Sequence, residues 1–554
     1  LRNQLQSLIS QVKKKDNLLA TKNKEFHDFK EGIRTILSEN QLALQKKKKI
    51  KWTVDEISKA FTIRYLSKRC YFYLRNTLNY KLPGISSLQR WASRIDMRQG
   101  VLQDILRVMQ AIGLTMTDIE RTTVLAFDEI KVFSLDEYDK QHDEILGPHK
   151  HMQVVMARGL FTNWKQPIFV NFDTKMTKSI LMDIIDKLHT ASYSVVACVS
   201  DCGGGNIGLW KELGITIEQT NFLHPITNEA VYVFTDAPHL LKLIRNWFID
   251  TGFILENGSL ITKQPLEALM QQTTESEVSS CYKLTSAHLK CQKAERQNVA
   301  LAAQLMSHTT ATALIHYKPG LDKSLAQSTG EFIELISNWF DIMNSYSPEA
   351  NVPSKKPFGS DFQFQINVLD SVYDKISTMR CIKKNTLQIF QKGMLISIQS
   401  LKQLFNTLKA KYDFKYILTH CLNQDALENF FSQIRTRGGL YDHPTPIHAL
   451  HRIRMIILGK NPGIVQKNLN TVEATHDEYM FVKAMEEAHI SIQTENIELP
   501  VQENSDTESF SSTSTSPAGN QRTIILTCVL EKDGLKYLAG WIAKKFKHKY
   551  PHLG

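Results

Sequence analysis

The sequence lacks several features that would place it in common classes. None of its eight cysteines forms a Cys-x-x-Cys pair, and Cys198 and Cys202 have no second Cys/His pair at zinc-finger spacing. A structural zinc site is therefore not expected, and the cysteine usage is typical of a reducing intracellular compartment. No apolar run is long enough for a membrane helix, and the first residues lack the apolar core of a signal peptide. These absences disfavour secreted and membrane classes.

Nucleotide-binding signatures are also missing. The sequence holds no P-loop and no Asn-Lys-x-Asp motif, so it does not resemble a classical GTPase. We find no internal repeat, and the chain begins with Leu1 rather than Met, as expected of a fragment or a processed form.

The charge is abundant and unevenly distributed. The 554 residues carry a net charge of +11. Residues 1–51 hold 13 Lys/Arg against 5 Asp/Glu, whereas residues 473–508 hold 10 acidic groups against one Lys. Residues 499–521, rich in Ser, Thr, Pro and Glu, are predicted to be disordered. A basic N-terminal segment and an acidic segment near the C-terminus are typical of a DNA-binding protein. The length of the chain predicts three to five structural units.

Residues 5–36 show a heptad pattern. Apolar residues at a 3.5-residue period cause helices to pair, so we expect a dimerising coiled coil. The alternative is an amphipathic helix packed on its own domain. One seam position is filled by Leu5, Val12, Leu19, Phe26 and Ile33, and the other by Leu8, Phe29 and Ile36, with Lys15 and Lys22 interrupting it.

Residues 52–107 are predicted to be helical and contain helix-turn-helix punctuation. Pro83-Gly84 breaks the chain, a Ser caps the next helix, and Leu88 and Trp91 mark its buried side. The alternative is a helical hairpin with a solvated basic face, but the upstream lysine run favours DNA binding. The residues expected to contact DNA here are Lys46, Lys47, Lys48, Lys49, Gln89, Arg90 and Arg94.

From residue 122 the pattern changes to strands. The order is three strands, helix, strand, helix, strand, helix, which is the order of a ribonuclease H (RNase H)-like fold. A mainly helical insertion is expected from 249 to about 415. The predicted strands are 122–132, 151–157, 167–172, 193–200 and 230–234, and the predicted helices include 177–190, 238–248 and 423–437.

In this order of strands and helices, two aspartates are candidates for catalytic residues. Asp128 lies in an apolar strand, where an uncompensated charge is costly to bury, although it could also face solvent. Asp201 ends the apolar fourth strand before three glycines, where open sheets bind ligands. The first and fourth strands are neighbours in this fold, so we expect the two carboxylates to meet and to need a cation.

A third acid is expected from the late helix. Asp425 and Glu428 share one of its faces, and the macrodipole alone explains Asp425 better than Glu428. Three carboxylates predict Mg²⁺ or Mn²⁺, and two such ions promote phosphodiester displacement. Arg435 and Arg437 follow on the same helix and could hold the DNA backbone.

Together these stretches resemble the P element-type transposases, the THAP-domain family. The resemblance runs from about residue 50 to 470 and includes the closing helix. It implies cut-and-paste DNA transposition with Asp128, Asp201 and Glu428 as the Asp-Asp-Glu (DDE) catalytic and metal-binding triad. The family's amino-terminal zinc domain is not found in these residues. The matching stretches are FDEIKV (127–132), GLFTNWKQPIFVNF (159–172), VVACVSDCGGGNIGLWKELGI (195–215), FTDAPHLLKLIRN (234–246), SNWFDIMNS (337–345), LNQDALENFFSQIRTRGGLYDHPTP (422–446) and YLAGWIAKK (537–545).

The resemblance also implies a GTP-binding insertion, in which GTP helps to assemble protein with DNA ends. Two positions depart from the family: Glu277 replaces an Asp, and Asn298 replaces a Lys that would contact phosphate or base. The alternative is a helical insertion that only touches DNA. The family's nucleotide contacts fall on Lys283, Val299, Ser307, Phe340, Asp341, Asn344 and Asp425.

We therefore expect a nuclear, metal-dependent transposase that binds double-stranded DNA as a homodimer or higher oligomer. One alternative is a domesticated, non-catalytic DNA-binding regulator, against which the intact triad favours the transposase. The other is a structure-selective nuclease, which has no obvious need for the long insertion. The expected fold is mixed α and α/β. The predicted units are a coiled coil (1–45), a helix-turn-helix domain (46–115), an RNase H-like catalytic domain in two parts (116–248 and 416–470), a helical insertion (249–415), and an acidic segment with a C-terminal helix (471–554).

Overall fold

The structure is a computed structural model. It describes residues 2–34, 37–38, 41, 51–92, 95–139, 142–275, 284–317, 323–436 and 443–460. Several predictions lie outside these residues: Lys46 to Lys49, Arg94, Glu277, Lys283, Arg437, the acidic stretch 473–508, the segment 499–521 and the closing helix.

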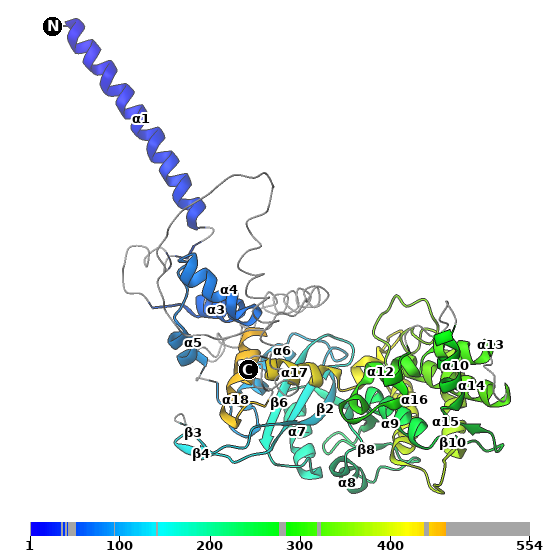
Figure 1. The fold of residues 1–554 in the computed structure, drawn as a ribbon. Coiled ribbons are helices and arrows are strands. Elements are labelled where there is room, and N and C mark those ends of the chain that lie inside the picture. Colours follow the sequence, from blue (N-terminus) through cyan, green and yellow to red (C-terminus); the bar gives the residue numbers. More distant parts are fainter. Residues whose placement is uncertain are drawn as a thin grey trace, which may run out of the picture.

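A seven-stranded sheet forms the centre of the molecule (Figure 1). The strand order is β1-β6-β5-β2-β7-β9-β8. The first three long strands pair antiparallel, whereas β2, β7 and β9 run parallel. This confirms the predicted RNase H order, including the adjacency of the first and fourth long strands. The bounds are β1 (Gly100–Val101), β2 (Thr122–Lys131), β5 (His151–Gly159), β6 (Lys165–Phe172), β7 (Ser194–Ser200), β8 (Asn221–Leu223) and β9 (Ala230–Thr235).

Helices cover this sheet because each carries one apolar face. Helix α7, predicted at 177–190, follows its cap Thr177 and buries Leu181, Ile184, Ile185 and Leu188. Helix α9 begins with Asp236 as its N-cap, and Pro238 lies in its first turn. The helices that contact the sheet are α6 (Gln103–Gly113), α7 (Lys178–Thr190), α16 (Ile389–Lys411) and α17 (Asp425–Thr436). Helices α8 (Gly204–Glu212) and α9 (Ala237–Asp250) follow β7 and β9 in the chain.

The region before the sheet is helical, with one correction. Helix α3 (Val54–Leu66) starts at a capping box between Thr53 and Glu56, and it packs against α18 (Pro446–Lys460). The expectation that residues 52–107 are all helical is wrong at β1, which pairs with the edge of β6. The other elements here are α4 (Lys68–Phe72), a π-helical turn (Tyr73–Thr77) and α5 (Ile85–Ala92), and a hairpin of β3 (Glu137–Asp139) and β4 (Glu144–Leu146) follows β2.

The segment after α9 is mainly helical, as predicted, and its only sheet among the described residues has three two-residue strands. Figure 1 shows these helices beside the central sheet. The elements are β10 (Phe253–Ile254), β11 (Leu260–Ile261), α10 (Gln264–Glu275), α11 (Ser286–Lys290), a 3-10 turn (Lys293–Gln297), α12 (Val299–Leu305), α13 (His308–Tyr317), α14 (Lys323–Met343), α15 (Phe362–Thr378), β12 (Arg380–Cys381), α16 (Ile389–Lys411) and a second 3-10 turn (Thr419–Leu422).

Helix α16 lies within the predicted insertion but packs on the central sheet. Its serine hydroxyls pair with the backbone of β9: Thr235 N–H donates to Ser397 Oγ at 2.9 Å, and Ser400 Oγ donates to the Val233 carbonyl at 2.7 Å. A buried backbone group needs a partner, so these serines complete β9 where the short β8 has ended. No helix of the described residues is apolar and long enough to span a bilayer.

Candidate active site

Asp128 and Asp201 lie at one edge of the sheet. In the parallel pairing of β2 with β7, Ala126 is opposite Val199, and each aspartate lies two residues further along its strand. Asp201 directly follows the last residue of β7, where the strand's carboxyl end leaves the sheet. The two residues are therefore level with one another on neighbouring strands, as the sequence predicted.

The carboxylate of Asp201 is held by its own loop. Its Oδ1 accepts hydrogen bonds from Gly203 N–H at 2.8 Å and from Asn206 Nδ2 at 2.6 Å. A Cβ atom at position 203 would lie 2.9 Å from that same oxygen. A larger residue at position 203 would therefore have to displace the Asp201 carboxylate from its present position.

Glu428 comes from α17, in the late part of the chain. The helix buries Leu427, Phe430 and Phe431, and it contacts β2. Glu428 lies on its exposed side. The negative charge of Glu428 acts on Asp128 together with that of Asp201, so the three acids share one electrostatic environment.

The carboxyl group of Asp128 is perturbed by burial and by nearby charges. Burial is the largest cause that raises the pKa of Asp128. With the smaller effects of the charges on Asp201, Glu428 and Asp236, and against the lowering effect of the Glu129 backbone N–H, it brings the pKa to about 7. That N–H donates to Asp128 Oδ1 at 2.7 Å. Several like charges that crowd a half-buried group are the setting in which a bound cation lowers the energy.

The donor set fits a hard divalent ion, since carboxylate oxygens are the ligands that Mg²⁺ and Mn²⁺ prefer. The spacing of the triad is wider than in a closed metal site. Among the residues that the structure describes, only Asp139, His142 and Glu144 form a group of three whose ligand atoms all lie within 4.8 Å of one another. In this open arrangement of the triad, Asp201 Oδ1 is held by Gly203 and Asn206.

The group around Asp139 is balanced by basic side chains. His142 Nδ1 lies 2.7 Å from Asp139 Oδ2, and its Nε2 lies 3.6 Å from Asp96 Oδ1. Asp96 in turn accepts from Arg98 at 2.7 Å, and Arg454 lies close enough to Asp96 and Asp139 to be stabilised by them. These contacts form a mixed-charge network that links the β3–β4 hairpin to α18, and we assign no metal to it.

Two further residues at this edge of the sheet, Asp236 and Gln424, were not identified from the sequence. Asp236 follows β9 and is buried; its Oδ1 accepts from Gln424 N–H and its Oδ2 from His239 N–H, both at 2.8 Å. Gln424 is also buried and donates from Nε2 to the Phe127 carbonyl at 2.8 Å. An acid after an apolar strand is the signal that selected Asp201, so Asp236 could have been found. Gln424 carried no such signal.

Part of the predicted nucleotide set is brought together. Asn423 Nδ2 donates to Asn344 Oδ1 at 2.8 Å and to Asp425 Oδ2 at 2.9 Å, which joins α14 to the start of α17. Asp341 lies one helical turn before Asn344. Burial raises the pKa of Asp341, and the charge of Lys355 opposes this shift. Three further predicted contacts are half-buried on neighbouring elements: Val299, Ser307 and Phe340.

Asn298, which departs from the family pattern, has a structural role in this chain. Its side chain accepts from Leu301 N–H at 3.3 Å and caps α12. Asparagine is a favoured N-cap residue, so the helix start is stabilised at the position where a lysine was expected.

The predicted DNA-contacting side chains lie mostly on exposed faces. Gln89 and Arg90 are exposed on α5, opposite the buried Leu88, and Arg435 is half-buried near the end of α17. Gln89 also lines a cavity of about 450 Å³ with basic residues of α18, including His448, His451 and Arg454.

Helix α1 (Arg2–Arg34) extends away from the rest of the molecule (Figure 1). Its heptad residues Leu8, Val12, Leu19, Phe26 and Phe29 are exposed. The side chains of Leu5, Ile33 and Ile36 lie outside the described set.

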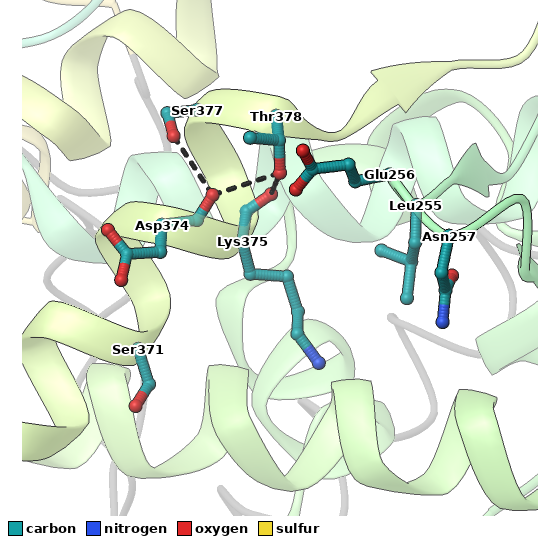
Figure 2. Close-up of a pocket in the computed structure, with 8 residues that line it drawn as sticks. All are labelled: Leu255, Glu256, Asn257, Ser371, Asp374, Lys375, Ser377 and Thr378. Carbon is teal, nitrogen blue, oxygen red and sulfur yellow. Dashed lines mark hydrogen bonds between the residues drawn. The ribbon is translucent and has the colours of Figure 1, made fainter.

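Another cavity, of about 730 Å³, lies between the β10–β11 turn and the end of α15 (Figure 2). The hydroxyls of Ser377 and Thr378 donate to the Asp374 carbonyl in its wall, at 2.9 and 3.0 Å. Of the predicted catalytic and nucleotide-contacting residues that the structure describes, none lines this cavity.

The strand order and the carboxylate edge define an RNase H-like protein with a large, mainly helical insertion. Family models match as "TNP-like, RNase H N-terminal domain" (97–214), "TNP-like, GTP-binding insertion domain" (238–357), "TNP-like, RNase H C-terminal domain" (420–448) and "87kDa Transposase" (463–554). The chain belongs to the P element transposase family.

Two relatives support this assignment. The Transposable element P transposase of Drosophila melanogaster is 36% identical over 440 residues, which cover 78% of this chain and 58% of that protein. The structure of the Drosophila P element transposase strand transfer complex has a TM-score of 0.75 at 35% identity, covering 79% of this chain and 99% of that chain. This chain therefore spans little more than half the length of the curated relative.

Proposed function

We propose that this chain is a DDE-type DNA transposase that cuts transposon ends and joins them to target DNA. The observation that carries the proposal is the convergence of Asp128, Asp201 and Glu428, from two parallel strands and one helix, at the sheet edge. There, burial and the neighbouring charges raise the pKa of Asp128 to about 7. A cation between these groups would offset both effects.

The three carboxylates would hold Mg²⁺ or Mn²⁺. A pair of such ions activates an attacking oxygen and stabilises the leaving oxygen of a phosphodiester. The protein orients its own groups: Gly203 and Asn206 fix Asp201, the Glu129 N–H fixes Asp128, and α17 presents Glu428. Water as the attacking group gives cleavage, and a DNA 3′-hydroxyl gives joining.

The test is strand transfer with a pre-cleaved transposon end, Mg²⁺ and a target plasmid. Asp128→Asn, Asp201→Asn and Glu428→Gln should each abolish joining while DNA binding is retained. Glu129→Gln is the matched control, because Glu129 is an exposed acid on the same strand. Joining at the wild-type rate by all three variants would contradict the assignment. Wild-type protein that binds the ends but joins none would favour the domesticated regulator.

The proposal includes DNA binding by the helical region and assembly through α1, in the nucleus. Gln89 and Arg90 would contact DNA from the exposed face of α5, and Arg435 would contact its backbone. The exposed apolar seam of α1 would pair with a second copy of the chain, because apolar side chains at this spacing gain by mutual burial.

We also propose that the insertion binds GTP at the junction of α14 and α17. Support comes from the matched GTP-binding insertion model and from the bonded set of Asn344, Asn423 and Asp425. Titration with labelled GTP should give saturable binding to the wild type and at least tenfold weaker binding to Asp341→Ala. Glu331→Ala, an exposed acid on the same helix, is the control. Absence of saturable binding to the wild type would end this part of the proposal.

A further inference from the structure

The residues that begin α17 are anchored to two other elements of the active-site edge. Gln424 donates from its backbone N–H to Asp236 Oδ1 and from its side chain to the Phe127 carbonyl, each at 2.8 Å. Phe127 is the residue before Asp128 on β2. Gln424 and Asp236 are only 3% and 6% exposed, so water does not offer substitute partners.

Asp236 links this anchor to the end of β7, the strand that Asp201 follows. Its backbone N–H donates to the carbonyl of Ser200 at 3.0 Å, and Ser200 directly precedes Asp201. Both of its carboxylate oxygens accept backbone N–H groups, from His239 and Gln424. Hydrogen bonds to a carboxylate are stronger than those between neutral groups, so Asp236 is suited to hold backbone geometry.

Gln424 and Glu428 are one helical turn apart. The Glu428 N–H donates to the Gln424 carbonyl at 2.9 Å, so a displacement of Gln424 is passed directly to the residue that carries the third acid. The structure thus joins the neighbours of Asp128 and Asp201 to the helical turn that bears Glu428, through one buried pair.

Resting on the proposed function, we propose that Asp236 and Gln424 are positioning residues that set the location of Glu428 relative to Asp128 and Asp201. Neither is required to touch the metal or the DNA. A residue that orients metal ligands from outside the coordination sphere changes metal affinity when it is replaced. A residue that only caps α9 changes stability and leaves metal affinity unaltered.

The experiment measures Mn²⁺ binding to the full chain by electron paramagnetic resonance of free Mn²⁺, alongside the Mg²⁺ dependence of strand transfer. Gln424→Met removes the bond to Phe127 without altering charge, and it should weaken Mn²⁺ binding by about 10–100-fold. Asp236→Ala should do the same. Asp236→Asn loses the same charge but keeps an oxygen for the Gln424 N–H, so it should recover most of the affinity.

The matched control is Thr177→Ala, which removes the N-cap of α7, where Thr177 Oγ accepts from Ile180 N–H at 3.3 Å. It should lower thermal stability and leave Mn²⁺ affinity unchanged. Unchanged affinity in Asp236→Ala and Gln424→Met would overturn the proposal, as would an equal loss in Thr177→Ala. Asp128→Asn distinguishes failure of the proposed function from failure of the positioning role. If Asp128→Asn retains full Mn²⁺ binding, the proposed function fails. If it loses Mn²⁺ binding while the variants of Asp236 and Gln424 keep it, only the positioning role is refuted.

Discussion

Replacing Asp128 by Asn should stabilise the protein in the absence of divalent metal, although it should abolish joining. The pKa of Asp128 is raised from 3.8 to about 7, mainly by burial. Below about pH 4 the carboxyl is protonated in both the folded and unfolded chain, so it costs nothing. As the pH rises towards 7, the unfolded chain ionises first, and the free energy of unfolding falls.

The size of the effect follows from that interval. Each pH unit between the two pKa values corresponds to 1.36 kcal/mol, so full ionisation costs at most about 4 kcal/mol. Solvent reaches part of the half-buried Asp128 side chain, and we therefore expect about 2–4 kcal/mol. Asn has no such cost, and in a domain of this size the gain corresponds to a midpoint about 4–10 °C higher.

The assay is thermal unfolding of wild type, Asp128→Asn and the control Glu129→Gln in a metal chelator at pH 5 and pH 8. The gain for Asp128→Asn should be less than half as large at pH 5. Adding Mg²⁺ should raise the midpoint of the wild type and leave that of the variant nearly unchanged. A lower midpoint for Asp128→Asn at pH 8, or an equal gain at both pH values, would refute the electrostatic reasoning.

Two further predictions concern other parts of the chain. Leu19→Asp on α1 should halve the mass measured by sedimentation equilibrium, because it places a charge in the apolar seam. The control Ser10→Asp changes an exposed residue off the seam and should leave the mass unchanged. A monomeric wild type would contradict the pairing of two chains through α1. Gly459→Ala should destabilise the chain by about 1–3 kcal/mol in thermal unfolding, because a Cβ there would lie 2.2 Å from Tyr65 Cβ. The control is Gly208→Ala in α8, where a Cβ would meet nothing within 4 Å, so this change should be neutral or stabilising. Equal effects of Gly459→Ala and Gly208→Ala on the unfolding temperature would show that the close packing of α18 on α3 is wrong.

Five strands of the central sheet were predictable because each is a short apolar run with few polar interruptions, whereas the three-residue β8 was not predicted. The predicted and observed ranges agree within two residues, for example 193–200 against Ser194–Ser200. Strand β1 was not predictable from its two residues, Gly100 and Val101, since only pairing with β6 makes them a strand. The segment that contains α16 was predicted only as mainly helical, and the packing of α16 against β9 depends on contacts of Ser397 and Ser400 with a strand distant in the chain.

Local sequence by itself determined the elements and the candidate acids: apolar periodicity sets which segments become strands or helices, and an acid at a strand end or in an apolar strand is conspicuous. The tertiary structure determined which of those acids lie close together and how strongly their charges interact. The contact of Asp236 with Gln424 joins residues that are 188 positions apart, and the pKa of Asp128 depends on burial by several elements. Such effects arise from distances between side chains, which are set only when the chain has closed its core.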